Sequence, residues 1–378
     1  MQKKIKIGIT GKAGFVGTHL FNTIGLRPDM YEQIPFEDAF FSSKELLQDF
    51  VKACDVIVHL AAVNRSENID ELYKTNIFLV ESLIQAMENT QVKPLVLFSS
   101  STQEKLDNPY GKSKIKGREL FESWAKKNNA PFVGLIVPNV FGPFCKPNYN
   151  SFIATFCHRL THGETPEIIN DSSVKLIYVE SLCHFILNSI FENIQTKNIK
   201  QIEVPYDFEE KVSVILHKLT HYRDDYFNNG YIPTLLDSNE VALFNTFRSY
   251  IDLENFFPKK LKMNTDERGS FVETIRLGTG GQVSFSTTHT GITRGNHFHT
   301  RKIERFTVIQ GNAKIELRKI GTNEIVTFEL DGKEPSYVDM PIWYTHNITN
   351  IGKDELFTQF WINEWYDESN PDTYFEKV

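Results

Sequence analysis

The sequence has no long apolar segment, which excludes a protein embedded in a membrane. No apolar run approaches the roughly 18 residues that a membrane-spanning helix needs. Residues 1–7 carry three lysines and lead into a short apolar stretch, without the longer apolar core and cleavage site of a secretory signal peptide. We therefore expect a cytoplasmic protein with no membrane partner.

Cysteine and clustered positive charge are also scarce. Cys54, Cys145, Cys157 and Cys183 lie among apolar or aromatic residues without paired spacing, which indicates buried reduced thiols instead of disulfides. The formal net charge is -7, and Lys and Arg are spread along the chain rather than gathered in blocks. This distribution argues against nucleic acid as the main partner.

Apolar residues, by contrast, are plentiful enough for two cores. The 378 residues exceed what one core usually serves. Hydrophobic residues make up 40% of the chain and charged residues 24%, and 30 phenylalanines supply core volume. A globular protein of two domains is expected.

The front of the chain alternates β-branched apolar runs with helical patterns. The runs that predict buried strands are 5–10, 55–61, 94–100 and 132–137. The segments with helical spacing are 15–24, 69–87 and 110–128. This alternation predicts an α/β doubly wound parallel sheet of the Rossmann type.

From about residue 263 onward, the pattern changes to short alternating segments broken by Gly and Asn. These segments are 282–288, 305–310, 313–319 and 355–363. They predict an all-β sandwich or barrel. Residues 246–261 are interpreted as a linker with an aromatic anchor at Phe256 and Phe257. We therefore expect one domain over residues 1–250 and a second over residues 258–378.

A glycine-rich turn follows the first predicted strand and opens the first predicted helix. Gly11 allows a tight turn, Gly14 lets a pyrophosphate approach N–H groups at the helix N-terminus, and Gly17 packs helix on strand. An ordinary strand-to-helix turn could carry the same glycines. The position directly after the first strand favours a dinucleotide site.

A second cluster follows the predicted strand at 94–100. Ser101 comes directly after it, and Tyr110 and Lys114 lie four residues apart on one face of the next helix. An ammonium there lowers the phenol pKa and binds the nicotinamide ribose, so Tyr110 can donate a proton while the cofactor supplies hydride. Ser101 would hold the carbonyl. A Tyr–Lys pair alone is usually a solvated surface pair, but the glycine turn upstream favours catalysis.

A different chemistry is indicated in the back half. The spacing Gly291-x5-His297-x-His299-x4-Glu304-x6-Gly311 fits a metal-binding cupin motif, and His346 supplies a fourth ligand from the second cupin motif. Three imidazoles and one carboxylate suit Zn²⁺, and Fe²⁺, Mn²⁺ or Ni²⁺ fit the same geometry. The alternatives are surface histidines near a turn, or a cupin whose site is structural.

The segments GKAGFVG, VIVHLAAVNR, LFSSST, NPYGKSK and PNVFGP resemble the extended short-chain dehydrogenase/reductase superfamily, especially its sugar-nucleotide epimerases and reductases. The resemblance implies a catalytic triad of Ser101, Tyr110 and Lys114. It implies a nicotinamide cofactor, expected to be NADPH, with NADH as the alternative. The implied cofactor-binding residues are Gly11, Gly14, Phe15, Val16, Gly17, Leu60, Ala61, Ala62, Tyr110 and Lys114.

Segments around the histidines resemble dehydrorhamnose epimerases, which are also cupins and remove a proton beside a 4-keto group. The matching segments are 266–273, 282–284 and 293–297. By this similarity Arg268 and Arg294 are candidates to hold a nucleotide diphosphate, and His297 is a ligand, a base or both. The alternative for Arg268 is a surface salt bridge that closes a β-turn.

Over nearly its whole length, with R-G-N-H-F-H and N-P-D-T-Y-F in the back half, the chain resembles the bifunctional capsular polysaccharide enzymes of the CapF family. The resemblance implies a UDP-4-keto-6-deoxy-N-acetylhexosamine substrate, UDP-2-acetamido-2,6-dideoxy-hexos-4-ulose. The cupin would epimerise C3 with a metal stabilising the enolate. The front domain would then reduce the C4 ketone with NADPH to UDP-N-acetyl-6-deoxy-L-talosamine, on the route to UDP-N-acetyl-L-fucosamine and capsule or O-antigen polysaccharide. A homodimer is expected, because cupins and reductases of this kind commonly assemble as dimers.

Two other functions stay open at this point. One is a monofunctional 4-keto sugar-nucleotide reductase with a structural cupin, which predicts that changing His297 leaves product stereochemistry unchanged. The other is a cofactor-sensing regulatory or scaffold protein. Ser101, Tyr110 and Lys114 argue against the sensor, because a sensor needs no proton donor.

Overall fold

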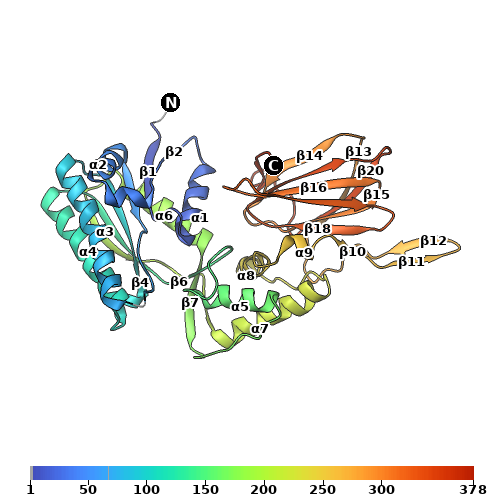
Figure 1. Ribbon diagram of the computed structural model, residues 1–378, viewed down its shortest axis with the longest axis horizontal. Coiled ribbons are helices and arrows are strands. Elements are labelled where there is room, and N and C mark those ends of the chain that lie inside the picture. The colour runs from blue at the N-terminus through green and yellow to red at the C-terminus, as the bar shows by residue number, and fades with distance from the viewer. Residues whose placement is uncertain (1–2, 67) are drawn as a thin grey trace. The chain divides into compact units, whose positions relative to one another are not determined.

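The chain packs as two compact units in the computed structural model, which describes residues 3–66 and 68–378 (Figure 1). Unit 1 comprises Met1–Phe141, Cys145–Phe152 and Ser172–Lys211. Unit 2 comprises Gly142–Phe144, Ile153–Asp171 and Val212–Val378. Residues 212–250, which the sequence pattern placed in the first domain, therefore lie in unit 2.

Unit 1 is built on a six-stranded parallel sheet with the order β2-β1-β3-β4-β5-β8. Its strands are β1 (Ile5–Thr10), β2 (Tyr31–Ile34), β3 (Val56–His59), β4 (Leu95–Ser101), β5 (Phe132–Val137) and β8 (Ile199–Glu203). Their near-continuous apolar runs need cover on both faces of the sheet, as parallel sheets do. The predicted doubly wound fold is confirmed.

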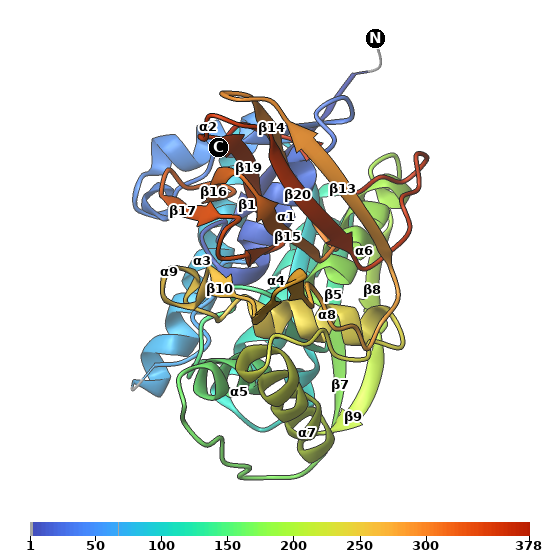
Figure 2. The ribbon, with the colours of Figure 1, turned by 90° about the vertical axis from the view of Figure 1, so that its right-hand side faces the viewer.

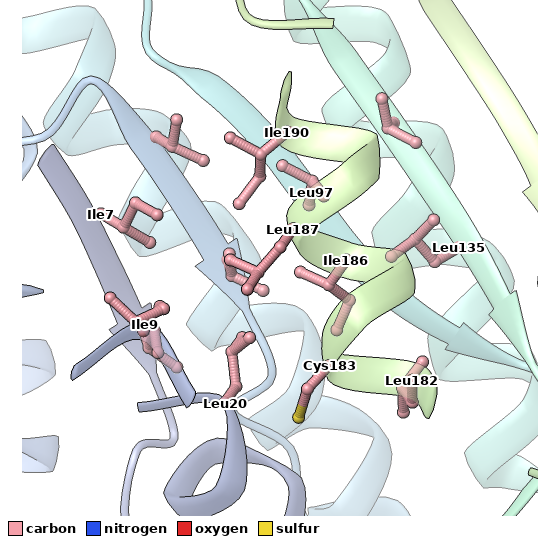
Figure 3. Close-up of a cluster of buried hydrophobic side chains, with 14 of the residues drawn as sticks. Ile7, Ile9, Leu20, Leu97, Leu135, Leu182, Cys183, Ile186, Leu187 and Ile190 are labelled. Carbon is pink, nitrogen blue, oxygen red and sulfur yellow. The ribbon is translucent and has the colours of Figure 1, made fainter. Parts of the chain in front are cut away.

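Helices cover both faces of this sheet (Figure 1). One face carries α1 (Phe15–Gly25) and α6 (Val179–Asn193), and the other carries α2 (Lys44–Ala53), α3 (Ile69–Thr90) and α4 (Pro109–Asn128). Figure 3 shows Ile186 and Ile190 of α6 beside Leu97 and Leu135 of the sheet, and all four are at most 1% exposed. Burying one such side chain contributes about 1.5–3 kcal/mol. This core fixes the strand ends that form the first site.

Smaller elements complete unit 1. A second sheet has the order β6-β7-β9, from β6 (Asn139–Phe141), β7 (Ser173–Tyr178) and β9 (Phe208–Lys211). Two 3-10 helices, η1 (Asp38–Ser42) and η2 (Thr102–Lys105), follow β2 and β4.

Unit 2 contains two five-stranded sheets, ordered β10-β18-β15-β20-β13 and β17-β16-β19-β14-β21. Figure 2 shows β13, β20 and β15 side by side, and their pairing is antiparallel. The strands are β10 (Lys259–Lys260), β13 (Gln282–Thr288), β14 (Thr293–Phe298), β15 (Glu304–Gln310), β16 (Asn312–Lys319), β17 (Ile325–Asp331), β18 (Ser336–Met340), β19 (Tyr344–Asn350), β20 (Leu356–Ile362) and β21 (Tyr374–Phe375). The predicted all-β architecture is confirmed. A separate hairpin, β11 (Met263–Asp266) and β12 (Gly269–Val272), extends away from these sheets (Figure 1).

Helices also belong to unit 2, and buried polar bonds explain why. They are α5 (Phe152–Thr161), α7 (Val212–Tyr222), the π-helix η3 (Arg223–Asn228), α8 (Ser238–Arg248) and α9 (Leu253–Phe256). The hydroxyl of Tyr226 donates to Asp339 at 2.8 Å, and Arg248 donates to the carbonyl of Met340 at 2.9 Å. These bonds attach residues 212–250 to the β-sheets.

The prediction of a linker at 246–261 is wrong, because this segment is packed. It contains the end of α8 and all of α9. Phe256 and Phe257 are 8% and 5% exposed, so the predicted aromatic anchor is confirmed.

All four cysteines are buried and none forms a disulfide, as predicted. Within the described parts of the chain, no helix combines the length and apolar character needed to cross a membrane.

Candidate functional site

The carboxyl ends of β1 and β3 lie side by side where the strand order reverses, with β2 on one side of β1 and β3 on the other. In open α/β sheets such a switch point opens a ligand crevice. Gly11 follows β1 with φ of 71°, and a Cβ added there would lie 2.8 Å from the Cα of Ala61. Only glycine fits this turn. Leu60, Ala61 and Ala62 continue from β3 and are partly exposed beside it.

The first turn of α1 is open to an anion. Gly14 is its N-cap residue, and no side chain caps the helix. A Cβ on Gly17 would collide with the carbonyl oxygen of Gly11, whereas one on Gly14 would approach that oxygen only to 3.2 Å. Phe15 and Val16 form the first turn and pack partly against the core. The turn therefore fits a pyrophosphate held by backbone N–H groups.

Tyr110 and Lys114 lie in the first two turns of α4. The side chain of Asn108 caps this helix by accepting from the N–H of Gly111 at 2.7 Å. Lys114 Nζ lies 5.5 Å from the Tyr110 ring centroid and donates to the carbonyl of Ser99 at 2.9 Å. Lys114 is only 3% exposed, which excludes the alternative of a solvated surface pair.

Burial has the largest effect on the pKa values of Lys114 and Tyr110. It lowers the pKa of Lys114 to about 8 and raises the pKa of Tyr110 to about 12. The expected lowering of the phenol pKa by Lys114 is therefore wrong for this structure, because desolvation has the larger effect.

Ser101 ends β4, two residues beyond the carbonyl that binds Lys114. Its hydroxyl oxygen accepts from the N–H of Gln103 at 3.2 Å and caps η2. The three predicted catalytic residues therefore come from β4 and from the helix bonded to its end.

A pocket of about 560 Å³ opens beside Tyr110. Its lining is Asn64, Arg65, Ser66, Leu72, Gln103, Asn108, Pro109 and Tyr110. Amide, hydroxyl and guanidinium groups of this kind orient polar ligands in pockets. Sequence reasoning named only Tyr110 among them as a site residue, because the others lie in the loop after β3 or at helix starts, where no spacing rule marks them.

Asn76 of α3 is a further residue that the sequence pattern did not reveal. It is 5% exposed, accepts from the N–H of Val63 at 2.7 Å and donates to Ser113 at 3.0 Å. Asn76 thus fixes the loop after β3 against the helix that carries Tyr110.

Unit 2 brings together all four predicted metal ligands. One ligand atom each from His297, His299, Glu304 and His346 lies within 4.8 Å of every other. His297 belongs to β14, His299 follows it, Glu304 begins β15 and His346 lies on β19. His297 and His346 are direct cross-strand partners. Both sheets of the cupin therefore contribute to one cluster.

The geometry of this cluster fits a divalent ion. The Nε2 atoms of His299 and His346 each lie 3.1 Å from Glu304 Oε2. At His346 this is proximity without a well-directed hydrogen bond, which leaves a buried Nε2 unsatisfied. Ligand atoms of a tetrahedral site lie about 3.4 Å apart at bond lengths near 2.1 Å, so movements on the order of 1 Å would bring these four atoms into position around an ion. The oriented, unsatisfied nitrogen is what a ligand atom requires.

The protonation states of Glu304 and His297 also suit a cation. Burial acts to raise the pKa of Glu304, but the hydrogen bond from His299 and the close approach of the His299 and His346 rings hold that pKa well below its usual range. Burial, together with the neighbouring His346 and His299, lowers the pKa of His297 to about 4. An ionised carboxylate and a neutral imidazole are the forms that bind metals.

Two backbone features aim the ligands. β14 has a bulge between Gly295 and His297, where Asn296 adopts a φ of 60°. Such bulges redirect side chains. Trp343 has a φ of 61°, and its N–H donates to the carbonyl of His299 at 2.8 Å. The ligand-bearing segment is therefore held from two sides.

The two arginines expected to bind substrate take no part in the backbone contacts that aim the four predicted ligands. Arg268, in the β11–β12 turn, is 85% exposed, and its guanidinium and backbone N–H both donate to Asp266. This is the turn-closing salt bridge weighed above as the alternative. Arg294 is exposed on β14, the strand that carries His297.

Comparisons with known proteins agree with this division of the chain. Residues 7–199 match the NAD dependent epimerase/dehydratase family, and residues 264–374 match the polysaccharide biosynthesis C-terminal domain.

Two relatives match over nearly the whole length. The UDP-2-acetamido-2,6-beta-L-arabino-hexul-4-ose reductase of Pseudomonas aeruginosa is 33% identical over 373 residues, which is 98% of each chain. The crystal structure of the capsular polysaccharide assembling protein CapF from Staphylococcus aureus is 34% identical, with a TM-score of 0.60 over 99% of this chain and 100% of that one. RMD from Pseudomonas aeruginosa, complexed with NADPH, shares the fold of 58% of this chain and 84% of its own, at 17% identity and a TM-score of 0.52.

Proposed function

The chain belongs to the CapF family of capsular polysaccharide enzymes, and from that premise we propose that it carries out two successive reactions on one UDP-4-keto sugar. The cupin epimerises C3 of UDP-2-acetamido-2,6-dideoxy-hexos-4-ulose. The front domain then reduces the C4 ketone with NADPH to UDP-N-acetyl-6-deoxy-L-talosamine, for UDP-N-acetyl-L-fucosamine and capsule or O-antigen synthesis. The observation that carries this proposal is the buried cluster of His297, His299, Glu304 and His346. Reduction of C4 by the front domain does not itself require this cluster.

In the reduction, Tyr110 is the proton donor. A bound nicotinamide supplies hydride to C4. A pKa of about 12 keeps Tyr110 protonated, so its hydroxyl can protonate the C4 oxygen as hydride arrives. Lys114, 5.5 Å from the ring centroid, stabilises the phenolate that remains. Ser101 orients the ketone, and the pocket beside Tyr110 receives the sugar.

In the epimerisation, the chain must remove a proton from C3 and return it on the opposite face. A divalent ion, which we assign as Zn²⁺, would supply Lewis-acid stabilisation of the enolate charge. His297 is the one member of the cluster that is not fully buried. With a pKa of about 4 it is neutral near pH 7 and able to accept a proton. His297 therefore serves as ligand, base or both.

Arg294 is the stronger candidate for the nucleotide diphosphate. It is exposed three residues before His297, on the same strand. Arg268 would first have to release Asp266. For the cofactor, the glycine turn at Gly11, Gly14 and Gly17 holds the pyrophosphate.

A homodimer forms part of the proposal, through the β11–β12 hairpin and the edge strand β13. Every residue of β11 is exposed, and Phe271 of β12 is 69% exposed. β13 ends its sheet and exposes Phe285 by 72%. An isolated hairpin is marginally stable in water, and an apolar edge strand invites pairing. A second copy of the chain would cover both. Four buried cysteines without disulfides support a cytoplasmic location.

The deciding experiment incubates the metal-loaded protein with the UDP-4-keto sugar in D₂O, without NADPH, and follows deuterium at C3 by NMR. We expect exchange that is lost in His297→Ala and retained in His289→Ala, a histidine whose side chain is 86% exposed. Absence of exchange in folded, metal-replete protein would instead support a reductase with a structural cupin.

NADPH oxidation tests the second reaction separately. We expect Tyr110→Phe to slow reduction by roughly 10²–10⁴-fold while C3 exchange continues. Equal loss of both activities would contradict the assignment of one reaction to each site.

A further inference from the structure

A buried aspartate holds the turn that carries His299. Asp372 is 2% exposed. Its Oδ1 accepts from the N–H of Thr300 at 3.0 Å and from the Thr300 hydroxyl at 2.7 Å. Its Oδ2 accepts from the N–H groups of Arg301 and Lys302, each at 3.0 Å. Four donors therefore converge on one carboxylate and fix the backbone directly after His299.

The backbone of the same aspartate reaches the ligand itself. The carbonyl oxygen of Asp372 lies 2.5 Å from Nδ1 of His299. Because a carbonyl oxygen can only accept, Nδ1 must carry the proton. The ligand nitrogen is then Nε2, which faces Glu304 at 3.1 Å. Asp372 has a φ of 41°, in a region that Asp tolerates better than most residues.

His299 is the ligand that needs this support from elsewhere in the sequence. The ring of His346 lies 3.2 Å from the carbonyl of Tyr344, two residues away on its own strand. His299, by contrast, lies beyond the end of β14, and its partner is 73 residues further along the chain. The short strand β21, which follows Asp372, adds to this support because it pairs with β14 at His297 and Phe298.

We propose that Asp372 is a positioning residue for the metal centre. Its carboxylate sets the turn after His299, and its carbonyl fixes the tautomer and direction of the His299 ring. The inference rests on the metal centre proposed above. It explains the N-P-D-T-Y-F segment, to which the two proposed reactions assign no role.

Two variants remove the carboxylate in different ways. Asp372→Asn keeps the side-chain shape and tolerates the positive φ, but its amide N–H groups would face two of the four donors. Asp372→Ala removes all four bonds. Asp367→Asn is the matched control, because Asp367 accepts from the N–H and hydroxyl of Ser369 in the same segment and is exposed.

The first readout is the Zn²⁺ dissociation constant from chelator competition. Partners that orient metal ligands typically affect affinity 10–100-fold, so both Asp372 variants should bind Zn²⁺ about 10–100 times more weakly than Asp367→Asn. The second readout is ¹⁵N NMR of the imidazoles, with His299 assigned by its absence in His299→Gln. The protonated Nδ1 signal should give way to a tautomer mixture in the Asp372 variants.

Thr300→Val provides a gentler test if both Asp372 variants unfold. It removes one of the four bonds and should weaken Zn²⁺ binding in the same direction by a smaller factor. Wild-type affinity and an unchanged His299 tautomer in a folded variant would overturn the positioning role while leaving the metal centre intact. A wild-type protein that binds no divalent metal would overturn the metal centre, and the role of Asp372 with it.

Discussion

Arg305 and Asp339 face each other across β15 and β18 as a buried ion pair. Arg305 Nε donates to Oδ1 at 2.6 Å and Nη2 donates to Oδ2 at 2.8 Å, with side chains 2% and 0% exposed. Tyr226 donates to the same carboxylate at 2.8 Å, and the guanidinium lies 3.6 Å from the Tyr337 ring centroid. The pair therefore joins the strand that begins with Glu304 to the helical part of unit 2.

Asp339→Ala should be strongly destabilising. It leaves a buried guanidinium without its counter-charge, which costs about 3–5 kcal/mol. Denaturant unfolding should show this loss. Glu334→Ala breaks the exposed pair with Lys260, so it should cost less than about 1 kcal/mol and serves as the control. Similar small losses in both variants would contradict a structural role for the buried pair.

Lys114→Met should stabilise the protein near neutral pH while abolishing reduction. Burial lowers the pKa of Lys114 from 10.5 to about 8, so the unfolded chain binds a proton that the folded chain releases between these values. The free energy of unfolding should therefore rise with pH between 8 and 10.5. The destabilisation caused by burying the charged Lys114 is fully present below pH 8. At 1.36 kcal/mol per pKa unit, this destabilisation amounts to roughly 3 kcal/mol.

Thermal unfolding from pH 7 to 10.5 measures this effect. The rise should disappear in Lys114→Met and persist in Lys112→Met, an exposed lysine of the same helix. A Lys114→Met protein that is less stable at pH 7 would show that its bond to the Ser99 carbonyl outweighs the desolvation.

Gly14→Ala and Gly17→Ala should fail in different ways. A Cβ on Gly17 collides with the carbonyl of Gly11, so Gly17→Ala should disrupt folding of unit 1. A Cβ on Gly14 needs only a small adjustment, so Gly14→Ala should fold but bind the nicotinamide cofactor more weakly. Circular dichroism and cofactor titration separate the two effects. Unchanged cofactor affinity in Gly14→Ala would contradict the assignment of this turn as the pyrophosphate-binding site.

Metal removal should lower the stability of the cupin. Binding to the folded state alone contributes about 2.7 kcal/mol when free Zn²⁺ is 100 times its dissociation constant. Chelation should therefore lower the unfolding midpoint, and restored Zn²⁺ should raise it again. His346→Ala should abolish this response, because its Nε2 is buried in the cluster. An unfolding midpoint that changes with neither chelator nor added Zn²⁺ would contradict the assignment of a metal site.

Phe285→Glu should convert a dimer into monomers. It places a charge on the exposed edge strand proposed to meet a second copy. Sedimentation velocity should give the dimer mass for wild type and for Phe191→Glu, which changes a phenylalanine of α6 that is 69% exposed. A monomeric wild type would rule out the homodimer.

Sequence patterns predicted the elements well where the signal is local. The strands at 5–10 and 282–288 match β1 and β13 because alternation and β-branching are properties of neighbouring residues. The clustering of His297, His299, Glu304 and His346 was also predictable, since the cupin motifs impose fixed spacing. In both cases the geometry of a strand determines the residue spacing within a short segment of the sequence.

Long-range polar pairing left no such signal. Tyr226 and Arg248 look like ordinary helix residues, and their partners, Asp339 and Met340, lie 113 and 92 residues away. The expected boundary at residue 250 therefore misses the helices of unit 2. The role of Asp372 was not predictable for the same reason, because a carboxylate that holds a distant turn has no local pattern.

The chain passes between the two units at 141/142, 144/145, 152/153, 171/172 and 211/212, and this interleaving limits how such a protein can be rearranged. A fragment covering 258–378 would keep the cluster of His297, His299, Glu304 and His346 but lose Tyr226 and Arg248, which donate to Asp339 and Met340 of β18. The two units are therefore not modules that recombination can exchange at a single junction. A gene fusion that preserves the cupin must bring its helical support from the middle of the chain with it.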